Sequence, residues 1–284
     1  MKELALLAPA KVNLCLHVLG RRDNGYHELA MLMVPLAFGD TVKIVLREEP
    51  GIEVDCAGVE LPPGEENIAA RAVRYMLERT EYAGGVRVDI DKQVPVAAGL
   101  GGGSSDAASV LCGLNRLLGL GLQQDELMEI GVGLGADVPF FVRGETAWAT
   151  GIGERLETVE NLPPAWYVLV NPGFAVSTAW VYGNLGLTTP GAPTKMPRFS
   201  GQIDEIAALL HNDLEAVTAV RYPEIAEIKG LLLEMGALGA LMSGSGPTVF
   251  GLFEDEATAR RAATELSKKL EWRVVVTTAF DRQR

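Results

Sequence analysis

The run PVAAGLGGGSSD, from Pro95 to Asp106, constrains the fold of this chain more than any other segment. Glycine lets the backbone adopt positive φ values and approach another group closely. Apolar residues with helical spacing follow the run directly, at Ala107, Val110, Leu111, Leu114, Leu117 and Leu118. A glycine-serine run is often a flexible linker, but one that leads straight into a helix can also bind an anion.

The context favours the anion-binding interpretation. The run is short, begins at Pro95 and leads into a helix whose apolar face has to pack. Residues Val86–Ile90, just before it, alternate as a strand does, and Ser104 or Ser105 is placed to be the N-cap of the helix. Unsatisfied N–H groups and a partial positive charge at a helix N-terminus attract phosphate. The sequence therefore predicts a strand, a phosphate-binding loop and a capped helix.

Two common nucleotide-binding motifs do not match. The chain has no GxxxxGKS or GxxxxGKT sequence, and both GxGxxG alignments fail because Ser104 or Asp106 stands at the last glycine position. This argues against a P-loop NTPase and against a dinucleotide-binding dehydrogenase.

Composition limits the partners of the chain. The formal net charge of −12 argues against a surface for nucleic acid or anionic lipid. Cys15, Cys56 and Cys112 are widely spaced and form no CxxC pair, so they indicate neither a disulfide framework nor a cysteine zinc site. The uncharged stretch 236–253 contains five glycines and a proline and is a poor membrane span. With no signal peptide recognised, we expect a cytoplasmic protein without nucleic-acid or membrane partners; no oligomeric state is indicated.

The periodicity predicts mixed α+β structure in two domains. Segments typical of strands open the chain at Val12–Leu19, Met31–Leu36 and Thr41–Leu46, and a helical pattern covers Glu66–Thr80. Punctuation at 161–164 and 187–201 gives domains 1–160 and 161–284. In the second domain we expect, in order, strand Trp166–Val170, helices Ile203–Leu210 and Pro223–Met235, strands Leu238–Met242 and Thr248–Phe253, helix Glu256–Lys269 and strand Arg273–Thr277.

Four separated segments resemble the motifs of one family, the GHMP kinases. They are APAKVNLCLHVLGRRDNGYHEL at 8–29, PVAAGLGGGSSDAA at 95–108, GADVPFF at 135–141 and SGSGPTVFGLF at 243–253. The resemblance spans nearly the whole chain and implies a two-domain α+β fold, with a ribosomal-protein-S5-like N-terminal domain, a ferredoxin-like C-terminal domain and the active site between them. It implies an enzyme that transfers phosphate from ATP to an alcohol group of a small molecule.

In this family the second motif wraps the phosphates of ATP. The matching residues are Pro95, Val96, Ala97, Ala98, Gly99, Leu100, Gly101, Gly102, Gly103, Ser104 and Ser105. ATP carries a divalent cation, normally Mg²⁺. Ser105 is a candidate contact by analogy with related kinases, but no carboxylate stands at a matching position, so the metal ligands stay unassigned.

The resemblance implies two catalytic residues. Lys11, in PAKVN, matches a lysine at the reacting centre, where its charge can steady the attacking oxygen and the transferring group; an isolated lysine is otherwise a solvated surface residue. Asp137, in GADVPFF, matches the residue that orients or deprotonates the acceptor hydroxyl. Its plainer interpretation is an aspartate that caps the turn before Pro139.

For the substrate side, the resemblance implies a CDP-linked small molecule. His27 matches a histidine at the cytosine edge, Tyr26 lies beside it, and Tyr182 matches an aromatic residue that stacks on the base, with Phe174 and Trp180 as rivals. Asn13 and Thr178 match polar substrate positions. Ordinary packing and hydrogen bonding are the plainer interpretation of each of them.

Two alternatives stay open. Another kinase of the same superfamily, acting on homoserine or mevalonate, would need no pocket for cytosine. A nucleotide-binding regulator would have lost catalysis, which the presence of Lys11 and Asp137 argues against. The segment Ser243–Pro247 by itself predicts a hairpin turn, and the resemblance places it beside the active site without a catalytic group.

Overall fold

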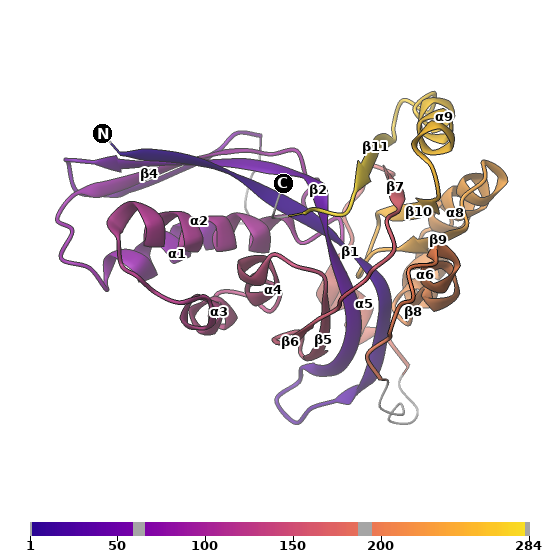
Figure 1. The fold of residues 1–284 in the computed structure, drawn as a ribbon, viewed down its shortest axis with the longest axis horizontal. Helices are drawn as coiled ribbons and strands as arrows, with labels where there is room; N and C mark the ends of the chain where they lie inside the picture. The colour runs from indigo at the N-terminus through magenta and orange to yellow at the C-terminus, as the bar shows by residue number, and fades with distance from the viewer. Residues whose placement is uncertain (1, 59–65, 187–194, 282–284) are drawn as a thin grey trace. The chain divides into compact units, whose positions relative to one another are not determined.

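The computed structural model describes residues 2–58, 66–186 and 195–281. They form two compact units that are not consecutive in the sequence (Figure 1). The first unit contains residues 1–10, 38–96 and 101–144, and the second contains 11–37, 97–100 and 145–284. The division into domains 1–160 and 161–284 stays a prediction beside this division, and part of the punctuation at 187–201 lies outside the described residues.

Two long strands, β1 (Glu3–Arg21) and β2 (His27–Arg47), run through both units. The first unit contains the start of β1, up to residue 10, and the end of β2, from residue 38. Together with β3 (Ile52–Cys56) and β4 (Gly85–Asp91) they form a sheet in the order β3-β4-β2-β1. Strand β4 pairs antiparallel with β2 and parallel with β3. We expected three short strands here; the chain instead stays extended from His27 to Arg47, through the gap between two of them.

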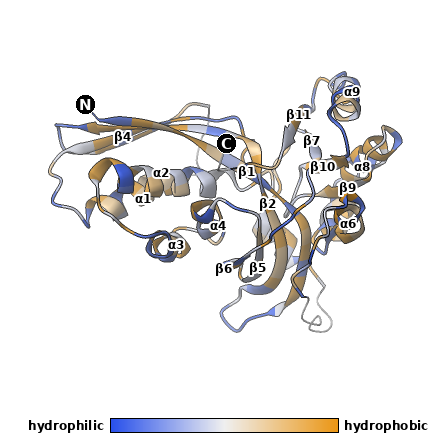
Figure 2. Cartoon of the chain, viewed as in Figure 1, coloured by the Kyte–Doolittle hydropathy of each residue, from blue (hydrophilic) through white to orange (hydrophobic). Residues whose placement is uncertain are grey.

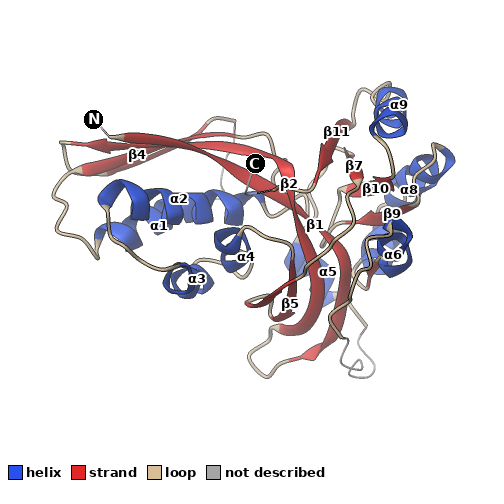
Figure 3. Cartoon of the chain, in the orientation of Figure 1, coloured by secondary structure: helices blue, strands red, loops and turns tan. Residues whose placement is uncertain are grey.

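In the described part of the first unit, four helices lie beside this sheet (Figure 3). They are α1 (Ile68–Leu77), α2 (Gly102–Leu118), α3 (Gln124–Val132) and α4 (Val138–Arg143). The apolar positions predicted for α1 and α2 are mostly buried. Helix α2 packs closely on β2, because a Cβ on Gly113 would lie 2.4 Å from Ile44 Cδ1. The helix that follows the glycine loop therefore packs directly against the sheet.

The second unit contains a four-stranded antiparallel sheet in the order β11-β7-β10-β9. Its strands are β7 (Trp166–Asn171), β9 (Gly239–Met242), β10 (Val249–Phe253) and β11 (Arg273–Thr278). Helix α8 (Glu224–Glu234) contacts β9 and β10, and α9 (Glu256–Leu266) contacts β7 and β11. Other elements, described below, lie between β7 and α8 in the chain. Without them the order is β7-α8-β9-β10-α9-β11, the βαββαβ pattern of the predicted ferredoxin-like domain, so that prediction is confirmed.

The second unit also contains residues 11–21 of β1 and 27–37 of β2, with which further short strands pair. Strand β5 (Ala147–Gly151) pairs with β2 and with β6 (Arg155–Thr158), and β8 (His211–Asn212) pairs with β1. The helices are α5 (Thr178–Gly183), α6 (Ile203–Leu209) and α7 (Glu215–Arg221). Much of β1 and β2 is made of hydrophobic residues (Figure 2). None of the helices in the described part of the chain combines the length and hydropathy of a membrane span.

Candidate active site

The predicted phosphate loop connects β4 to α2, and the helix begins inside the glycine run. Gly101 occupies the N-cap position with φ of 72°, and α2 starts at Gly102. The prediction that Ser104 or Ser105 caps the helix is wrong, because both lie within its first turn and no side chain makes a capping hydrogen bond. Glycine adopts this left-handed conformation without strain, so the helix starts without a serine cap.

A buried ion cluster anchors the start of this loop. Asp40 Oδ1 accepts hydrogen bonds from the backbone N–H groups of Gln93, at 2.5 Å, and Val94, at 2.7 Å. Lys92 Nζ pairs with Asp40 and with Asp106, the latter at 2.8 Å. Because Asp40 belongs to β2 and Asp106 to α2, the cluster ties the loop to the sheet and to the helix.

Burial sets the protonation of this cluster. Burial raises the pKa of Asp106 to about 7, although the Lys92 ammonium pulls it down. Burial by itself would lower the pKa of Lys92, but the carboxylates of Asp106 and Asp40 outweigh it and hold that pKa above its usual value. The lysine therefore stays charged, while Asp106 titrates near neutral pH.

The first turn of α2 offers backbone amides to a ligand. Ser105 N–H donates to Gly101 O at 3.0 Å, so the N–H groups of 102–104 precede the helix's own hydrogen-bond ladder. Gly103 is exposed, and the nearest atom to a Cβ built on it is Ile68 Cδ1, at 3.8 Å. Ser105 Oγ is buried without a hydrogen-bond partner among the described residues. An anion at this turn would accept hydrogen bonds from the amides, and a cation would bind the Ser105 oxygen.

The second unit holds residues 97–100 of the loop against the connection between β9 and β10. Gly99 has φ of 76°, and a Cβ on it would lie 2.1 Å from the carbonyl oxygen of Ser243. Ser243 Oγ donates to Gly99 O at 2.9 Å, and Thr248 N–H donates to Ala98 O at 3.3 Å. The predicted hairpin at Ser243–Pro247 is confirmed, since Met242 pairs with Val249. The two glycine segments of the sequence are therefore in contact.

Lys11 and Asn13 lie beside this hairpin. Both side chains are buried, and Lys11 Nζ donates to Asn13 Oδ1 at 2.5 Å. A Cβ on Gly244 would lie 3.4 Å from Lys11 Nζ and 3.5 Å from Asn13 Oδ1. The interpretation of Lys11 as a solvated surface lysine is therefore wrong. A buried ammonium group needs polar or anionic partners. A bound phosphate group would be such a partner.

Two predicted substrate residues, His27 and Tyr182, are in contact within the second unit. Their ring centroids are 4.8 Å apart, with 24° between the planes. Burial, and after it the charge of Arg21, lowers the pKa of His27, so the ring is neutral at pH 7 and has one donor and one acceptor nitrogen. Tyr26, next to it, is 58% exposed. These side chains offer both polar edges and ring faces to a flat ligand.

The rival aromatic residues have other partners. Phe174 stacks on Tyr222, with 4.6 Å between the ring centroids, and the Arg221 guanidinium lies 4.5 Å from the centre of the Trp180 ring. Tyr182 is thus the candidate that lies against His27.

Thr178 lies at the start of α5 and contacts the glycine hairpin. Its Oγ1 is 2.8 Å from the Oγ of Ser245. The hairpin thereby touches two predicted substrate residues, since Gly244 lies beside Asn13.

Asp137 stands at the N-cap position of α4, in the first unit. Its side chain makes no capping hydrogen bond to this helix. Residues 138–142 of the same helix are buried. The carboxylate therefore sits at the end of a buried helix and is not used to cap it.

The cluster of Asp40, Lys92 and Asp106 was not predicted from the sequence, and Ser243 and Ser245 were assigned no catalytic role. Asp40, Lys92 and Asp106 have no recognisable spacing in the sequence. Their ion pairs, like the hydrogen bond from Ser243 to Gly99, join segments far apart in the chain. The position of Asp106 at the end of the glycine run and the glycine-serine motif at 243–247 were the signals in the sequence.

Two family models match the chain: the GHMP kinases N terminal domain at residues 67–145 and the GHMP kinases C terminal model at residues 196–271. Together they cover more than half of the chain, which belongs to the GHMP kinases, a family of small-molecule phosphotransferases. The predicted family and its two-domain fold are confirmed.

Particular members of the family are similar over nearly the whole chain. The 4-diphosphocytidyl-2-C-methyl-D-erythritol kinase of Syntrophotalea carbinolica is 59% identical over 269 residues, which are 95% of this chain and 96% of that relative. The enzyme of the same name from Geobacter sulfurreducens is 55% identical over 272 residues, 96% of this chain and 97% of that relative.

Solved structures share the fold. A crystal structure of 4-(cytidine 5'-diphospho)-2C-methyl-D-erythritol kinase has a TM-score of 0.79 at 38% identity and covers 98% of this chain and 100% of its own. Homoserine kinase from Cytophaga hutchinsonii has a TM-score of 0.75 at 18% identity, over 98% of this chain and 95% of its own. The second likeness concerns the fold alone.

Proposed function

We propose that this chain transfers the γ-phosphoryl group of ATP to the 2-hydroxyl of 4-diphosphocytidyl-2-C-methyl-D-erythritol, a step of the non-mevalonate isoprenoid pathway. The observation that carries the proposal is the identity of 59% and 55%, over at least 95% of the chain, to relatives that bear this substrate's name. The chemistry of the loop, the lysine and the ring pair supports it.

The phosphates of ATP bind at the N-terminus of α2. The amides of 102–104 donate to phosphate oxygens, and the helix adds a partial positive charge of about half a unit. A divalent cation, normally Mg²⁺, neutralises phosphate charge when it is bound. The Ser105 hydroxyl fits as a protein oxygen on this ion, because it is buried and has no hydrogen-bond partner in the described part of the chain.

Lys11 and Asp137 act on the reacting groups. The Lys11 ammonium steadies charge on the transferring phosphoryl group, and its hydrogen bond to Asn13 fixes it in place before the reaction. Asp137 orients the acceptor hydroxyl and takes its proton. The transition state of phosphoryl transfer is loose, so orientation is the larger part of this role.

The cytidine end of the substrate binds at the aromatic residues. His27 hydrogen-bonds the cytosine edge through its neutral ring, and Tyr182, which lies against His27, stacks on the base. Tyr26 closes over the base from its exposed position. Asn13 and Thr178 hydrogen-bond the polar parts of the substrate.

A substrate panel tests this proposal. The purified full chain is incubated with Mg-ATP and the CDP-linked substrate, and in parallel with homoserine and with mevalonate, while ADP release is followed and the product weighed by mass spectrometry. We expect ADP and a product heavier by one phosphate with the CDP-linked substrate alone. Product from homoserine or mevalonate alone would overturn the substrate, and ATP binding without ADP release from any of the three would favour the regulator.

A further inference from the structure

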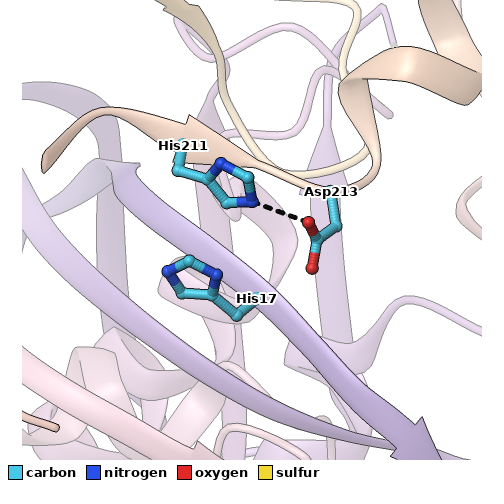
Figure 4. Close-up of side chains that lie close together, drawn as sticks. All are labelled: His17, His211 and Asp213. Atoms are coloured by element: carbon cyan, nitrogen blue, oxygen red, sulfur yellow. Dashed lines mark hydrogen bonds and ion pairs between the residues drawn. The ribbon is translucent and has the colours of Figure 1, made fainter. Parts of the chain in front are cut away.

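Two of the chain's three histidines lie against each other with an aspartate beside them, in the second unit (Figure 4). His17 belongs to β1 and His211 to β8. Their ring centroids are 4.5 Å apart with 15° between the planes, and His211 Nε2 is 2.6 Å from Asp213 Oδ1. The proposed kinase reaction uses none of the three.

Backbone pairing holds this cluster together. Strands β1 and β8 pair in parallel, with Cys15 opposite His211. The Asp213 N–H donates to Leu16 O at 3.0 Å, and Asp213 Oδ2 accepts from the Val18 N–H at 2.7 Å. The three side chains are therefore presented by hydrogen-bonded backbone.

We propose that His17, His211 and Asp213 bind one divalent transition-metal ion of the zinc class, each through one ligand atom, with water at the fourth position. Their ligand atoms lie within 4.8 Å of one another. Tetrahedral zinc, with bonds of about 2.0–2.2 Å, places its ligand atoms roughly 3.3 Å apart. The required closure is small enough for side-chain rotation.

Solvent exposure allows that rotation. The His211 side chain is 49% exposed and the Asp213 side chain 33%. One ring of the stacked pair has to turn, because a metal lies near the plane of the imidazole that it binds. His211 is the ring that turns, and the ion replaces the proton that it shares with Asp213.

The ligand set selects the metal. Two imidazoles and one carboxylate suit zinc, copper, nickel and other first-row ions, whereas Mg²⁺ prefers an all-oxygen shell. The Mg²⁺ that accompanies ATP therefore does not compete for this site.

The ion would stabilise the segment 211–213, which is hydrogen-bonded to the glycine hairpin. Asn212, between two ligands, donates through Nδ2 to Met242 O and to Gly244 O, each at 2.8 Å. A metal bound to the folded chain and not to the unfolded one raises its thermal stability. We expect this gain whether or not the proposed kinase function holds.

The test uses the untagged full chain, stripped of metal with a chelator and dialysed. Titration with Zn²⁺ is followed by calorimetry and by the melting temperature, and Co²⁺ serves as a coloured probe. We expect one bound Zn²⁺ per chain, a higher melting temperature, the intense visible bands of tetrahedral Co²⁺, and no competition from millimolar Mg²⁺.

Matched variants locate the ion. His17→Gln, His211→Gln and Asp213→Asn should each weaken Zn²⁺ binding by more than about tenfold, whereas His27→Gln, at the remaining histidine, should leave it unchanged. Should the Asp213 variant unfold, because that carboxylate also holds the Val18 N–H, the exposed His211 decides. No Zn²⁺ binding by the wild-type chain, or equal binding by the His27 and His211 variants, would overturn the proposal.

Discussion

The ammonium of Lys11 and the carboxylate of Asp137 are the charges on which the proposed reaction depends. Lys11→Met and Asp137→Asn should each lower kcat by at least about 10²-fold while ATP still binds, because the loop that holds the phosphates is untouched. Steady-state kinetics and nucleotide titration measure the two effects.

Surface residues of the same types are the controls for these variants. Lys43, in an exposed ion pair with Glu3, and Asp125, exposed in the first turn of α3, can be changed in the same way. Both control variants should keep kcat. Near-normal turnover in the Lys11 or Asp137 variant would contradict the assigned role.

Asp106 links pH to stability. Its pKa is about 7 in the folded protein, against 3.8 for an ordinary aspartate. Between these values the folded state holds a proton that the unfolded chain has released, so the stabilising contribution is full below about pH 4 and falls as the pH rises to about 7. Asp106→Asn should remove this part of the pH dependence. Urea unfolding at several pH values between 4 and 8 measures it, and equal slopes in both proteins would count against the raised pKa.

The start of α2 shows which glycines the fold needs and which it does not. A Cβ at Gly99 would collide with the hairpin, whereas a Cβ at Gly103 would meet only ordinary contact. Gly103→Ala should therefore keep or raise the melting temperature, since alanine favours a helix by about 0.5–1 kcal/mol, and should weaken ATP binding by crowding the phosphates.

Gly99→Ala is the matched comparison and should destabilise the protein itself. Thermal unfolding and nucleotide titration on both variants separate the two effects. Unchanged ATP affinity in the Gly103 variant would argue against phosphate at this turn.

A buried tyrosine on β7, Tyr167, provides a test of the core of the second unit. Tyr167 is fully buried, and its hydroxyl has no hydrogen-bond partner among the described residues. Burial raises the pKa of this phenol, which therefore stays neutral. Removing an unsatisfied buried hydroxyl is neutral or stabilising, so Tyr167→Phe should melt at the same or a higher temperature. A clear fall in the melting temperature would show that the hydroxyl has a partner, such as buried water.

Elements with a strong local signal were predictable. The amphipathic helices α8 and α9 and the strands of the four-stranded sheet lie within a few residues of the expected ranges. The length of β1 and β2 was not predictable, because a strand continues where cross-strand pairing continues, and pairing is not visible in local periodicity. The predicted serine cap is absent because Gly101, in the left-handed conformation, occupies the N-cap position.

At the scale of the whole molecule, the family motifs were enough to identify the fold, but the contacts between them were not visible in the sequence. The ion pairs of Lys92 and the cluster of His17, His211 and Asp213 join residues from distant parts of the chain. Strand β8, which carries His211, has only two residues and no periodicity to detect.

The candidate residues are shared between the two units. Residues 101–105 and Asp137 belong to the first unit, and Lys11, residues 97–100 and the substrate residues belong to the second. A reaction that uses all of them needs the full chain, so its tests use the full chain as well.

The proposed function depends on phosphate held by backbone amides at the first turn of α2. A crystal structure with Mg²⁺, a non-hydrolysable ATP analogue and the CDP-linked substrate tests this most directly. We predict phosphate oxygens about 3 Å from the amide nitrogens of 102–104. Phosphates bound away from residues 99–105 would contradict this phosphate site.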